Sequence, residues 1–258
     1  MRTADLFDLS GCAAIVTGGG RGIGRQMATA LAEQGADVVV CSRKLDRCEE
    51  AAAELEGLGV RALAMRCDAR EPDQVAEVVR RTTEELGGVD VLVNNAGATW
   101  GAPPEEVPLD AWRKVVDVNL TGVFVFCQEA GRAMIARGGG GRILNVASIA
   151  GMRGFPAGVV DALPYSASKG GVIALTQDLA CKWARHGIRV NALAPGWFPS
   201  DMSSAVLADR GDAIVGRIPL GRLGGEDDLK GAVAFLASRA SDFVTGQTLI
   251  VDGGESAW

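Results

Sequence analysis

The chain has 258 residues and a formal net charge of −6, from 26 lysines and arginines against 32 aspartates and glutamates. This length fits one large domain, and a hydrophobic share of 48% supplies an ordinary core, which excludes global disorder. The acidic balance argues against nucleic acid and anionic membrane surfaces as partners. Because the six cysteines contain no Cys-x-x-Cys pair and there is one histidine, we expect no metal site.

The beginning of the chain gives no sign of export. The first ten residues carry Asp5 and Asp8 and lack the basic and then apolar layout of a secretory signal peptide. No uncharged apolar run approaches the roughly 18 residues needed to span a bilayer. The cysteines are typical of small buried side chains in a reducing compartment. We therefore expect a cytoplasmic protein that does not bind a membrane.

Short apolar runs alternate with amphipathic stretches along the whole chain. In chain order, the expected elements are a strand at 13–17, a helix at 22–34, a strand at 37–41, a helix at 43–58, a strand at 62–66, a helix at 72–86, a strand at 91–94, a helix at 109–136, a strand at 142–147, a helix at 164–186, a strand at 188–194, helices at 201–216 and 227–237, and a strand at 248–251. Repeated strand–helix units predict a parallel sheet with helices on both faces.

The chain shows no composition break or proline- and serine-rich linker that would separate two domains. The glycine run at 138–141 is too short for that role. The strands are apolar almost throughout, which is typical of burial on both faces. We therefore expect one domain over residues 1–258, an α/β fold with a doubly wound parallel sheet of about seven strands.

A glycine-rich turn follows the first expected strand and opens the first helix. Residues 17–24 read Thr-Gly-Gly-Gly-Arg-Gly-Ile-Gly. Backbone N–H groups and the dipole at a helix N-terminus favour a phosphate, and glycines let the backbone approach it. An ordinary βα turn is the alternative, but the position favours a dinucleotide site. The candidate cofactor-binding residues of this turn are Gly18, Gly20, Arg21, Gly22, Ile23 and Gly24.

The end of the second expected strand carries Ser42, Arg43 and Lys44. Dinucleotide folds often place an acid here for the adenosine ribose hydroxyls, and that acid would repel a 2′-phosphate. Ser42 and Arg43 would accept the phosphate, with Arg21 close by in the glycine turn. The alternative is that Arg43 and Lys44 are solvated residues of a first helical turn. The pattern favours NADP(H) over NAD(H) as the cofactor.

Tyr165 and Lys169 lie four residues apart, on one face of the expected helix at 164–186. A free tyrosine has a pKa near ~10, and a nearby ammonium would favour the phenolate and lower that pKa. Tyr165 could then serve as an acid or base near neutral pH. A core tyrosine beside a surface lysine is the alternative for a lone pair, but Tyr165 is the only tyrosine in the chain.

These features together resemble the short-chain dehydrogenase/reductase family, and the resemblance extends along nearly the whole chain. The glycine turn matches that family's Thr-Gly-x-x-x-Gly-x-Gly pattern, and Asn-Asn-Ala-Gly at 94–97 matches its fourth-strand motif. Tyr165 and Lys169 match its Tyr-x-x-x-Lys pair, and Pro-Gly at 195–196 matches the motif beside the nicotinamide. The resemblance implies a single-domain Rossmann fold that binds NAD(P).

The resemblance also implies an activity, which is hydride transfer between NADP(H) and a carbonyl or secondary alcohol. Ser148 would bind the substrate carbonyl, and Tyr165 would move the proton. Lys169 would hold the ribose and lower the pKa of Tyr165, and Asn119 would anchor a water that returns the proton. Cofactor contacts outside the glycine turn would come from Ser42, Arg43, Asp68, Asn95, Ala96, Gly97, Tyr165, Lys169, Pro195, Gly196, Phe198 and Ser200.

The stretch between Ser148 and Tyr165 is a few residues longer than is usual in the family. The extra residues fall at 155–163, where a longer loop would lie over the substrate. We expect two lid segments, near 152–164 and 197–217, that are mobile without ligand and become ordered when cofactor and substrate bind.

The substrate stays open among a ketone, a β-ketoacyl thioester and a keto-sugar acid. A finer resemblance includes gluconate 5-dehydrogenase-like enzymes and β-ketoacyl reductases of the rhamnolipid type, and these two point to different substrates. Trp100, Met152, Phe155 and Trp197 would give a partly apolar wall, which favours the acyl substrate.

Two other functions are weighed against the reductase. An NAD-linked polyol or sugar-acid dehydrogenase is opposed by Ser42 and Arg43, and a non-catalytic cofactor-binding regulator is opposed by the intact Ser148, Tyr165 and Lys169. The family resemblance further implies self-association, most often as a homotetramer. An apolar stripe at 175, 179 and 183 either faces the sheet or forms part of a subunit interface.

Overall fold

A single parallel sheet runs through the computed structural model, which describes residues 1–156 and 159–258. The strands are β1 (Ala13–Thr17), β2 (Asp37–Ser42), β3 (Ala62–Arg66), β4 (Val91–Asn94), β5 (Gly141–Val146), β6 (Ile188–Pro195) and β7 (Thr248–Val251). Their order across the sheet is β3-β2-β1-β4-β5-β6-β7. The order reverses between β1 and β4, which is where open α/β sheets bind ligands at the carboxyl ends of their strands. The predicted doubly wound α/β sheet is confirmed.

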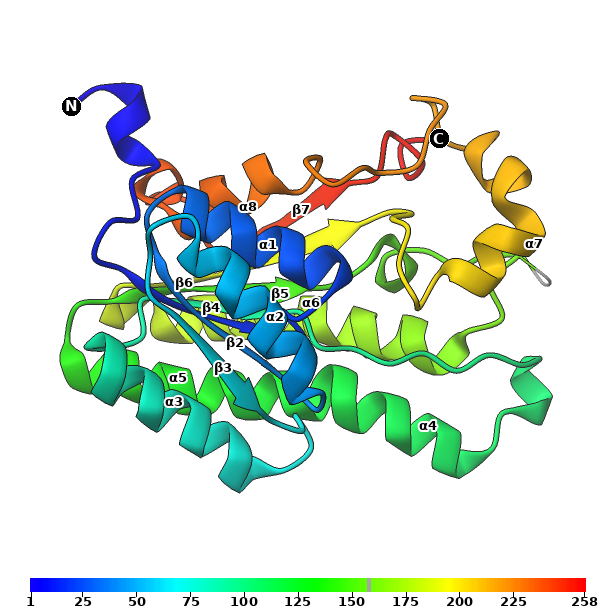
Figure 1. The fold of residues 1–258 in the computed structure, drawn as a ribbon. Coiled ribbons are helices and arrows are strands. Elements are labelled where there is room, and N and C mark those ends of the chain that lie inside the picture. The colour runs from blue at the N-terminus through cyan, green and yellow to red at the C-terminus, as the bar shows by residue number, and fades with distance from the viewer. Residues whose placement is uncertain (157–158) are drawn as a thin grey trace.

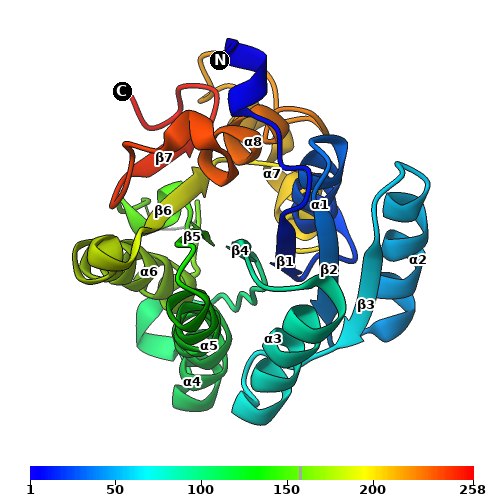
Figure 2. The ribbon, with the colours of Figure 1, turned by 90° about the vertical axis from the view of Figure 1, so that its left-hand side faces the viewer.

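Helices cover both faces of this sheet (Figures 1 and 2). The α-helices are α1 (Gly22–Glu33), α2 (Leu45–Glu56), α3 (Pro72–Leu86), α4 (Leu109–Val116), α5 (Gly122–Arg137), α6 (Leu163–Trp183), α7 (Ser204–Val215) and α8 (Lys230–Ala237). Residues of α1, α2 and α8 share one buried cluster with the sheet, and residues of α3, α5 and α6 share the other. Helix α7 lies outside both layers, beyond the carboxyl ends of β6 and β7 (Figure 1).

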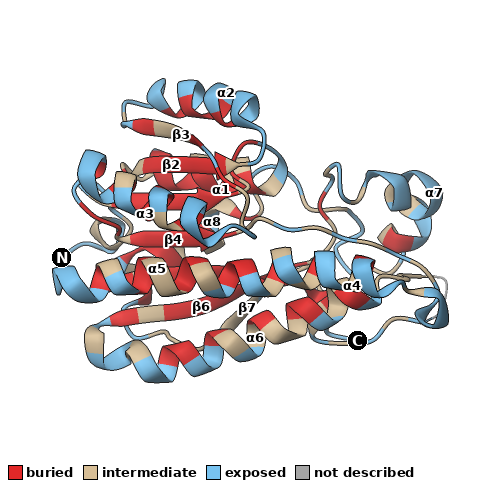
Figure 3. Cartoon of the chain, turned by 90° about the horizontal axis from the view of Figure 1, so that it is seen from below, coloured by how far each residue is buried: buried red, intermediate tan, exposed pale blue. Residues whose placement is uncertain are grey.

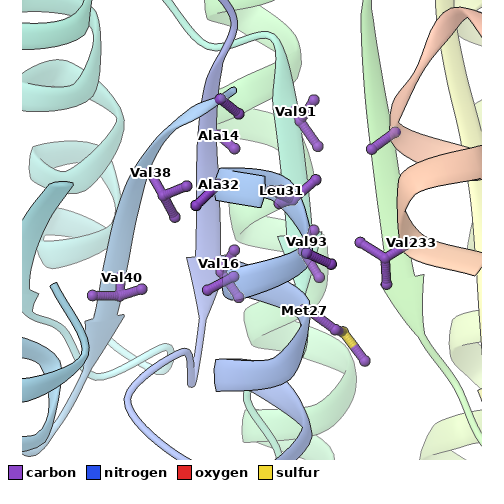
Figure 4. Packing of buried hydrophobic residues seen from close by; sticks show 14 of the residues in the cluster. Ala14, Val16, Met27, Leu31, Ala32, Val38, Val40, Val91, Val93 and Val233 are labelled. Atoms are coloured by element: carbon purple, nitrogen blue, oxygen red, sulfur yellow. The ribbon is translucent and has the colours of Figure 1, made fainter. Parts of the chain in front are cut away.

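The central strands β1 and β4 are buried on both faces, as their uniformly apolar sequences predict, whereas the edge strand β7 is partly exposed (Figure 3). Val16 and Val40 point to one face and pack with Met27 and Leu31 of α1 (Figure 4). Ile15, the sequence neighbour of Val16, belongs to the cluster on the opposite face. Since each fully buried side chain of this kind contributes roughly 1.5–3 kcal/mol, the sheet is a rigid base for the loops at its carboxyl edge.

Helix α2 begins at Leu45 rather than at the predicted residue 43. The Ser42 hydroxyl explains the delay, because it donates to the carbonyl oxygen of Lys44 (3.0 Å) and accepts from the Lys44 N–H (3.2 Å). Such side-chain bonds hold a turn in place of a helix. Arg43 and Lys44 therefore lie in a loop, and the alternative that they occupy the first turn of a helix is wrong.

Helix α7 begins at Ser204, after the predicted start at residue 201. The Ser203 hydroxyl accepts from the N–H of Ser200 (3.0 Å) and donates to the carbonyl oxygen of Phe198 (2.8 Å), which forms a turn before the helix. Inside α7, Arg210 departs from helical geometry, next to one of the glycines that weaken the helix. Helix α8 likewise begins at residue 230, not at 227.

The apolar stripe of α6 lies within the molecule. Leu179 is buried, and Leu175 and Trp183 pack against the same cluster between α6 and the sheet. The Trp183 ring lies against Gly131 of α5, where an added Cβ would come within 2.7 Å of it. This stripe faces the sheet, so it leaves little apolar surface for a subunit interface. No helix within the described ranges is long and apolar enough to cross a membrane.

Candidate active site

A cavity of about 380 Å³ opens at the carboxyl edge of the sheet, beyond the ends of β1 and β4. Most of the residues that the sequence predicts for the site line this cavity. They are Gly18, Arg21, Gly22, Ile23, Gly24, Ser42, Arg43, Asp68, Asn95, Ala96, Gly97, Ser148, Tyr165, Lys169, Pro195, Gly196, Phe198 and Ser200. Residues predicted from separate motifs therefore meet around one space.

Two predicted residues do not line the cavity. Gly20 faces α2, where an added Cβ would lie 3.0 Å from the backbone of Arg47. Its glycine is needed for this close approach of turn and helix, and a cofactor contact at Gly20 stays a prediction. Asn119 lies behind the wall, fully buried.

The glycines of the turn are required by contacts within the turn itself. Gly18 has φ +65°, and an added Cβ would lie 2.9 Å from Nδ2 of Asn95. A Cβ on Gly24 would lie 2.3 Å from the carbonyl oxygen of Gly18. Gly22 has φ +53° and begins α1, and a Cβ there would meet only Ser200, at 3.7 Å. The N-terminus of α1 is thus open toward the cavity, which suits a phosphate.

Thr17 and Asn95 connect the glycine turn to the end of β4. The Thr17 hydroxyl accepts from the backbone N–H groups of Asn95 and Ala96, both at 2.9 Å. In return, Nδ2 of Asn95 donates to the carbonyl oxygen of Thr17 (2.9 Å). Asn95 therefore supports the turn as well as lining the cavity. The Thr17 side chain was not among the predicted site residues, although its place before the first glycine was visible in the sequence.

The predicted phosphate-binding residues differ in their contacts. Arg21 forms an ion pair with Asp201, across the mouth of the cavity. Arg43 is exposed and lines the cavity, and no hydrogen bond or salt bridge to its side chain occurs within the part of the chain that the structure describes. Asp68 is held by Arg70 at 2.6 Å, which lowers the pKa of that carboxyl. Arg43 and its neighbour Lys44, which is also exposed and lines the cavity, are thus the cations most available to a ligand at this end.

Ser148 and Tyr165 come together at the other end of the cavity. Ser148 follows β5, and its hydroxyl accepts from the N–H of Ala150 (3.1 Å). A hydrogen bond with Ser148 lowers the pKa of Tyr165, but the larger effect is burial, which raises it. The phenol therefore keeps its proton at neutral pH in this structure.

Lys169 lies behind Tyr165 and is 3% exposed. Its Nζ donates to the carbonyl oxygen of Val146 (2.6 Å) and lies 5.6 Å from the centroid of the Tyr165 ring. Burial lowers the pKa of Lys169 to about 8. The predicted lowering of the Tyr165 pKa by Lys169 is not found, because the ammonium lies over the ring and burial dominates the titration of the phenol.

Asn119 sits in a five-residue π-helical turn, Asp117–Thr121, that joins α4 to α5. Its Oδ1 accepts from the N–H of Ala98 (2.7 Å), and its Nδ2 donates to the Ala98 carbonyl (2.9 Å) and to the Ser168 hydroxyl (3.0 Å). Ser168 in turn donates to the backbone carbonyl of Tyr165 (2.7 Å). Asn119 thus joins the loop after β4 to the first turns of α6. Its role with a bound water stays a prediction.

Comparisons with known proteins agree with this geometry. Residues 18–256 match the family model described as "Enoyl-(Acyl carrier protein) reductase". A gluconate 5-dehydrogenase of Gluconobacter oxydans is 41% identical over 256 residues, which cover 98% of each chain. The chain belongs to the short-chain dehydrogenase/reductase family. It is therefore an oxidoreductase of that family, and its predicted membership is confirmed.

Solved structures of this family superimpose closely on the chain. A short-chain type dehydrogenase/reductase from Mycobacterium marinum has a TM-score of 0.94 and 40% identity, covering 98% of this chain and 99% of that one. A gluconate 5-dehydrogenase from Burkholderia cenocepacia, solved in complex with NADP and tartrate, has a TM-score of 0.93 and 40% identity, covering 100% of both chains. The single Rossmann-type sheet is thus the family's fold.

A buried ladder of hydrogen-bonded polar side chains, which sequence reasoning missed, connects β4 and β5 to α6 next to the short-chain dehydrogenase site. Asn94 and Asn145 are paired in the register of β4 and β5, and Nδ2 of Asn94 donates to Oδ1 of Asn145 (2.9 Å). Nδ2 of Asn145 then donates to the Thr176 hydroxyl on α6 (3.0 Å). The ladder fixes α6, which carries Tyr165 and Lys169, against the sheet. Its only signal in the sequence was that each of two neighbouring apolar strands carries an asparagine near its end.

The two expected lid segments contribute to the cavity wall, except that residues 157–158 lie outside the described residues. Phe155 and Trp197 line the cavity as expected, whereas Trp100 and Met152 do not. Phe198 lies against Gly224, where an added Cβ would come within 2.3 Å of its ring. Within the described residues, no group of three or more histidines, cysteines or acids could hold a metal ion.

Proposed function

We propose that the protein transfers a hydride between NADP(H) and a carbonyl or secondary-alcohol substrate. The observation that carries this proposal is that Ser148, Tyr165 and Lys169 line the same cavity as the glycine turn and Arg43. A hydroxyl that can bind a carbonyl oxygen and a phenol that can give a proton thus share one space with a phosphate-binding helix end.

The residues at the far end of the cavity fit a dinucleotide phosphate. The N-terminus of α1 is open at Gly22, and Arg43 lines the cavity with no hydrogen bond or salt bridge to its side chain within the described residues. The B. cenocepacia relative, solved with NADP, supports the choice of NADP(H). Bound there, this cofactor would supply the hydride, and the chain would supply placement and charge.

The protein's own groups would move the proton. Tyr165 keeps its proton at neutral pH because burial raises its pKa, so it would donate to the carbonyl oxygen during reduction. Ser148 would hold that oxygen through its hydroxyl and stabilise the negative charge that develops there. Lys169 would bind the ribose, and Asn119 would anchor a water that returns the proton to Tyr165.

The substitution Tyr165→Phe tests this assignment. NADPH oxidation with ketones, β-ketoacyl thioesters and keto-sugar acids should be lost, while NADPH affinity in a fluorescence titration should stay nearly unchanged. Lys169→Ala should weaken both NADPH binding and activity, since a ribose that is no longer held would misplace the hydride donor. A kcat of Tyr165→Phe close to that of the unmodified protein would show that another group moves the proton.

A second candidate is an NAD-linked dehydrogenase of a polyol or sugar acid. The observation that favours it is the 41% identity to the G. oxydans gluconate 5-dehydrogenase. Ser42 and Arg43 oppose it at the cofactor end, because Ser42 stands where an acid would bind the ribose hydroxyls of NAD and the cation Arg43 follows it.

We also propose self-association as a homotetramer. Large apolar side chains remain exposed away from the cavity, on α5 at Phe124 and around β7 at Phe243 and Ile250. Surfaces of this kind commonly mark interfaces, and closed symmetric assemblies are the usual result. Light scattering at micromolar concentration should give a mass near four chains.

A further inference from the structure

The substrate end of the cavity is apolar around the reacting groups. Beyond Ser148 and Tyr165, its wall includes Ile149, Ala150, Phe155, Val160, Ala162, Trp197, Met202 and Val206, and the uncharged hydroxyl residues Thr99, Ser200 and Ser203 also line the cavity. Apart from Lys169, which is bonded to the Val146 carbonyl, the cations among the described lining residues lie in the glycine turn or at positions 43–47. Asp161 lies between Val160 and Ala162 in sequence but is not among the described lining residues, and Asp201, which does line the cavity, is paired with Arg21.

Two arginines stand directly behind this wall without reaching the cavity. The guanidinium carbon of Arg153 lies 5.0 Å from the centroid of the Phe155 ring, and that of Arg217 lies 5.8 Å from it. Neither arginine is among the described lining residues, whereas Phe155 is. The ring thus covers two positive charges that could otherwise meet a carboxylate of the substrate.

Glu255 holds these charges in place from the C-terminal segment. It is 2% exposed, its Oε1 accepts from Nη2 of Arg153 (2.7 Å), and its backbone oxygen accepts from Nη1 of the same arginine (2.7 Å). Arg217 lies 3.8 Å from the same Oε1, and the Trp197 side chain also approaches the carboxylate. Asp252 lies within electrostatic range of Arg153 as well. Two acids thus compensate two arginines.

We propose that the substrate is a neutral ketone, or the matching secondary alcohol, with an apolar flank, and that Glu255 sets this preference as a positioning residue by holding Arg153 behind Phe155. The inference rests on the proposed function and narrows its substrate. A carboxylate or a row of sugar hydroxyls in this space would lose water and find few partners. The identity to gluconate 5-dehydrogenase does not extend to the substrate, because no free cation faces it among the described residues.

Matched substrates test the preference directly. With the unmodified protein and NADPH, we expect kcat/KM for methyl 4-oxopentanoate to exceed that for 4-oxopentanoate by about 100-fold or more. An apolar ketone such as 2-octanone should likewise exceed 5-keto-D-gluconate. A preference for either acid would overturn this inference and leave the proposed function standing. Failure to reduce any carbonyl, with NADPH bound normally, would overturn both.

Variants test the part played by Glu255. Glu255→Gln leaves Arg153 without its main partner, so Arg153 can attract the carboxylate of 4-oxopentanoate. The ratio of kcat/KM for the ester to kcat/KM for the acid should therefore fall by about tenfold or more, because kcat/KM for the acid rises. NADPH affinity should not change, because Glu255 lies outside the cavity lining. Arg153→Met added to Glu255→Gln should restore the neutral preference, which a merely structural defect would not do. An unchanged ratio in folded Glu255→Gln would overturn the positioning role.

Discussion

Lys169 should make the stability of the protein rise with pH through the alkaline range. Burial lowers its pKa in the folded state to about 8, whereas an unfolded lysine titrates near ~10.4. Between these values the unfolded chain binds more protons than the folded one, so the free energy of unfolding increases with pH. The gap between the two pKa values corresponds to about 3 kcal/mol, and this is the penalty that the charged lysine imposes at pH 7.

The measurement is urea unfolding of the unmodified protein and of Lys169→Met at a series of pH values from 7 to 11. The free energy of unfolding of the unmodified protein, relative to that of Lys169→Met, should rise by about 3 kcal/mol across this range. Taking the difference removes the other groups that titrate there, such as Cys127, whose pKa burial raises to about 12. Tyr165→Phe is the matched control with opposite sign, because the raised pKa of Tyr165 makes stability fall as pH increases. Parallel curves for the unmodified protein and Lys169→Met would refute the reasoning.

Three further outcomes follow from the site. Arg43→Asp should weaken NADPH binding by at least about tenfold, because one charge-assisted hydrogen bond is lost. In titrations the preference should shift toward NADH, and an unchanged cofactor preference would exclude Arg43 from the phosphate site. Alcohol oxidation needs the Tyr165 phenolate, so its rate should rise toward alkaline pH, and Ser148→Ala should move the inflection higher because its hydrogen bond lowers the Tyr165 pKa; a downward move would contradict this. Amide hydrogen exchange in the segments near 152–164 and 197–217 should slow when NADPH and a substrate analogue bind; equal protection with and without ligands would remove the lid role.

The strands could be predicted from the sequence because burial on both faces leaves a plain signal. A run such as residues 37–41 has no polar alternation, and glycine or a loop follows each helix that precedes a strand. The site motifs could be predicted for a related reason. The glycine turn, Asn95 and Ser148 each follow the end of a strand, and the carboxyl ends of parallel strands meet at one edge of the sheet.

Other features had no local signal. The π-helical turn at Asp117–Thr121 widens the backbone by one residue within an otherwise helical pattern, and periodicity over five residues cannot separate the two geometries. The ion pair of Arg21 with Asp201 joins groups 180 positions apart. The direction in which Gly20 faces depends on the close approach of α2, which the turn's own sequence does not encode.

Glu255 was the least predictable residue of the site. An acid near the end of a chain is ordinarily solvated, and only the return of the C-terminal segment to Arg153 and Trp197 buries it. Burial raises the pKa of Glu255 and lowers the pKa of Lys169. In both cases burial disfavours the charged form of the side chain. Lys169 lines the cavity, whereas Glu255 lies behind its wall. The burial of both groups costs stability close to the site, and Glu255 holds the charge of Arg153 away from the space where a neutral substrate would react.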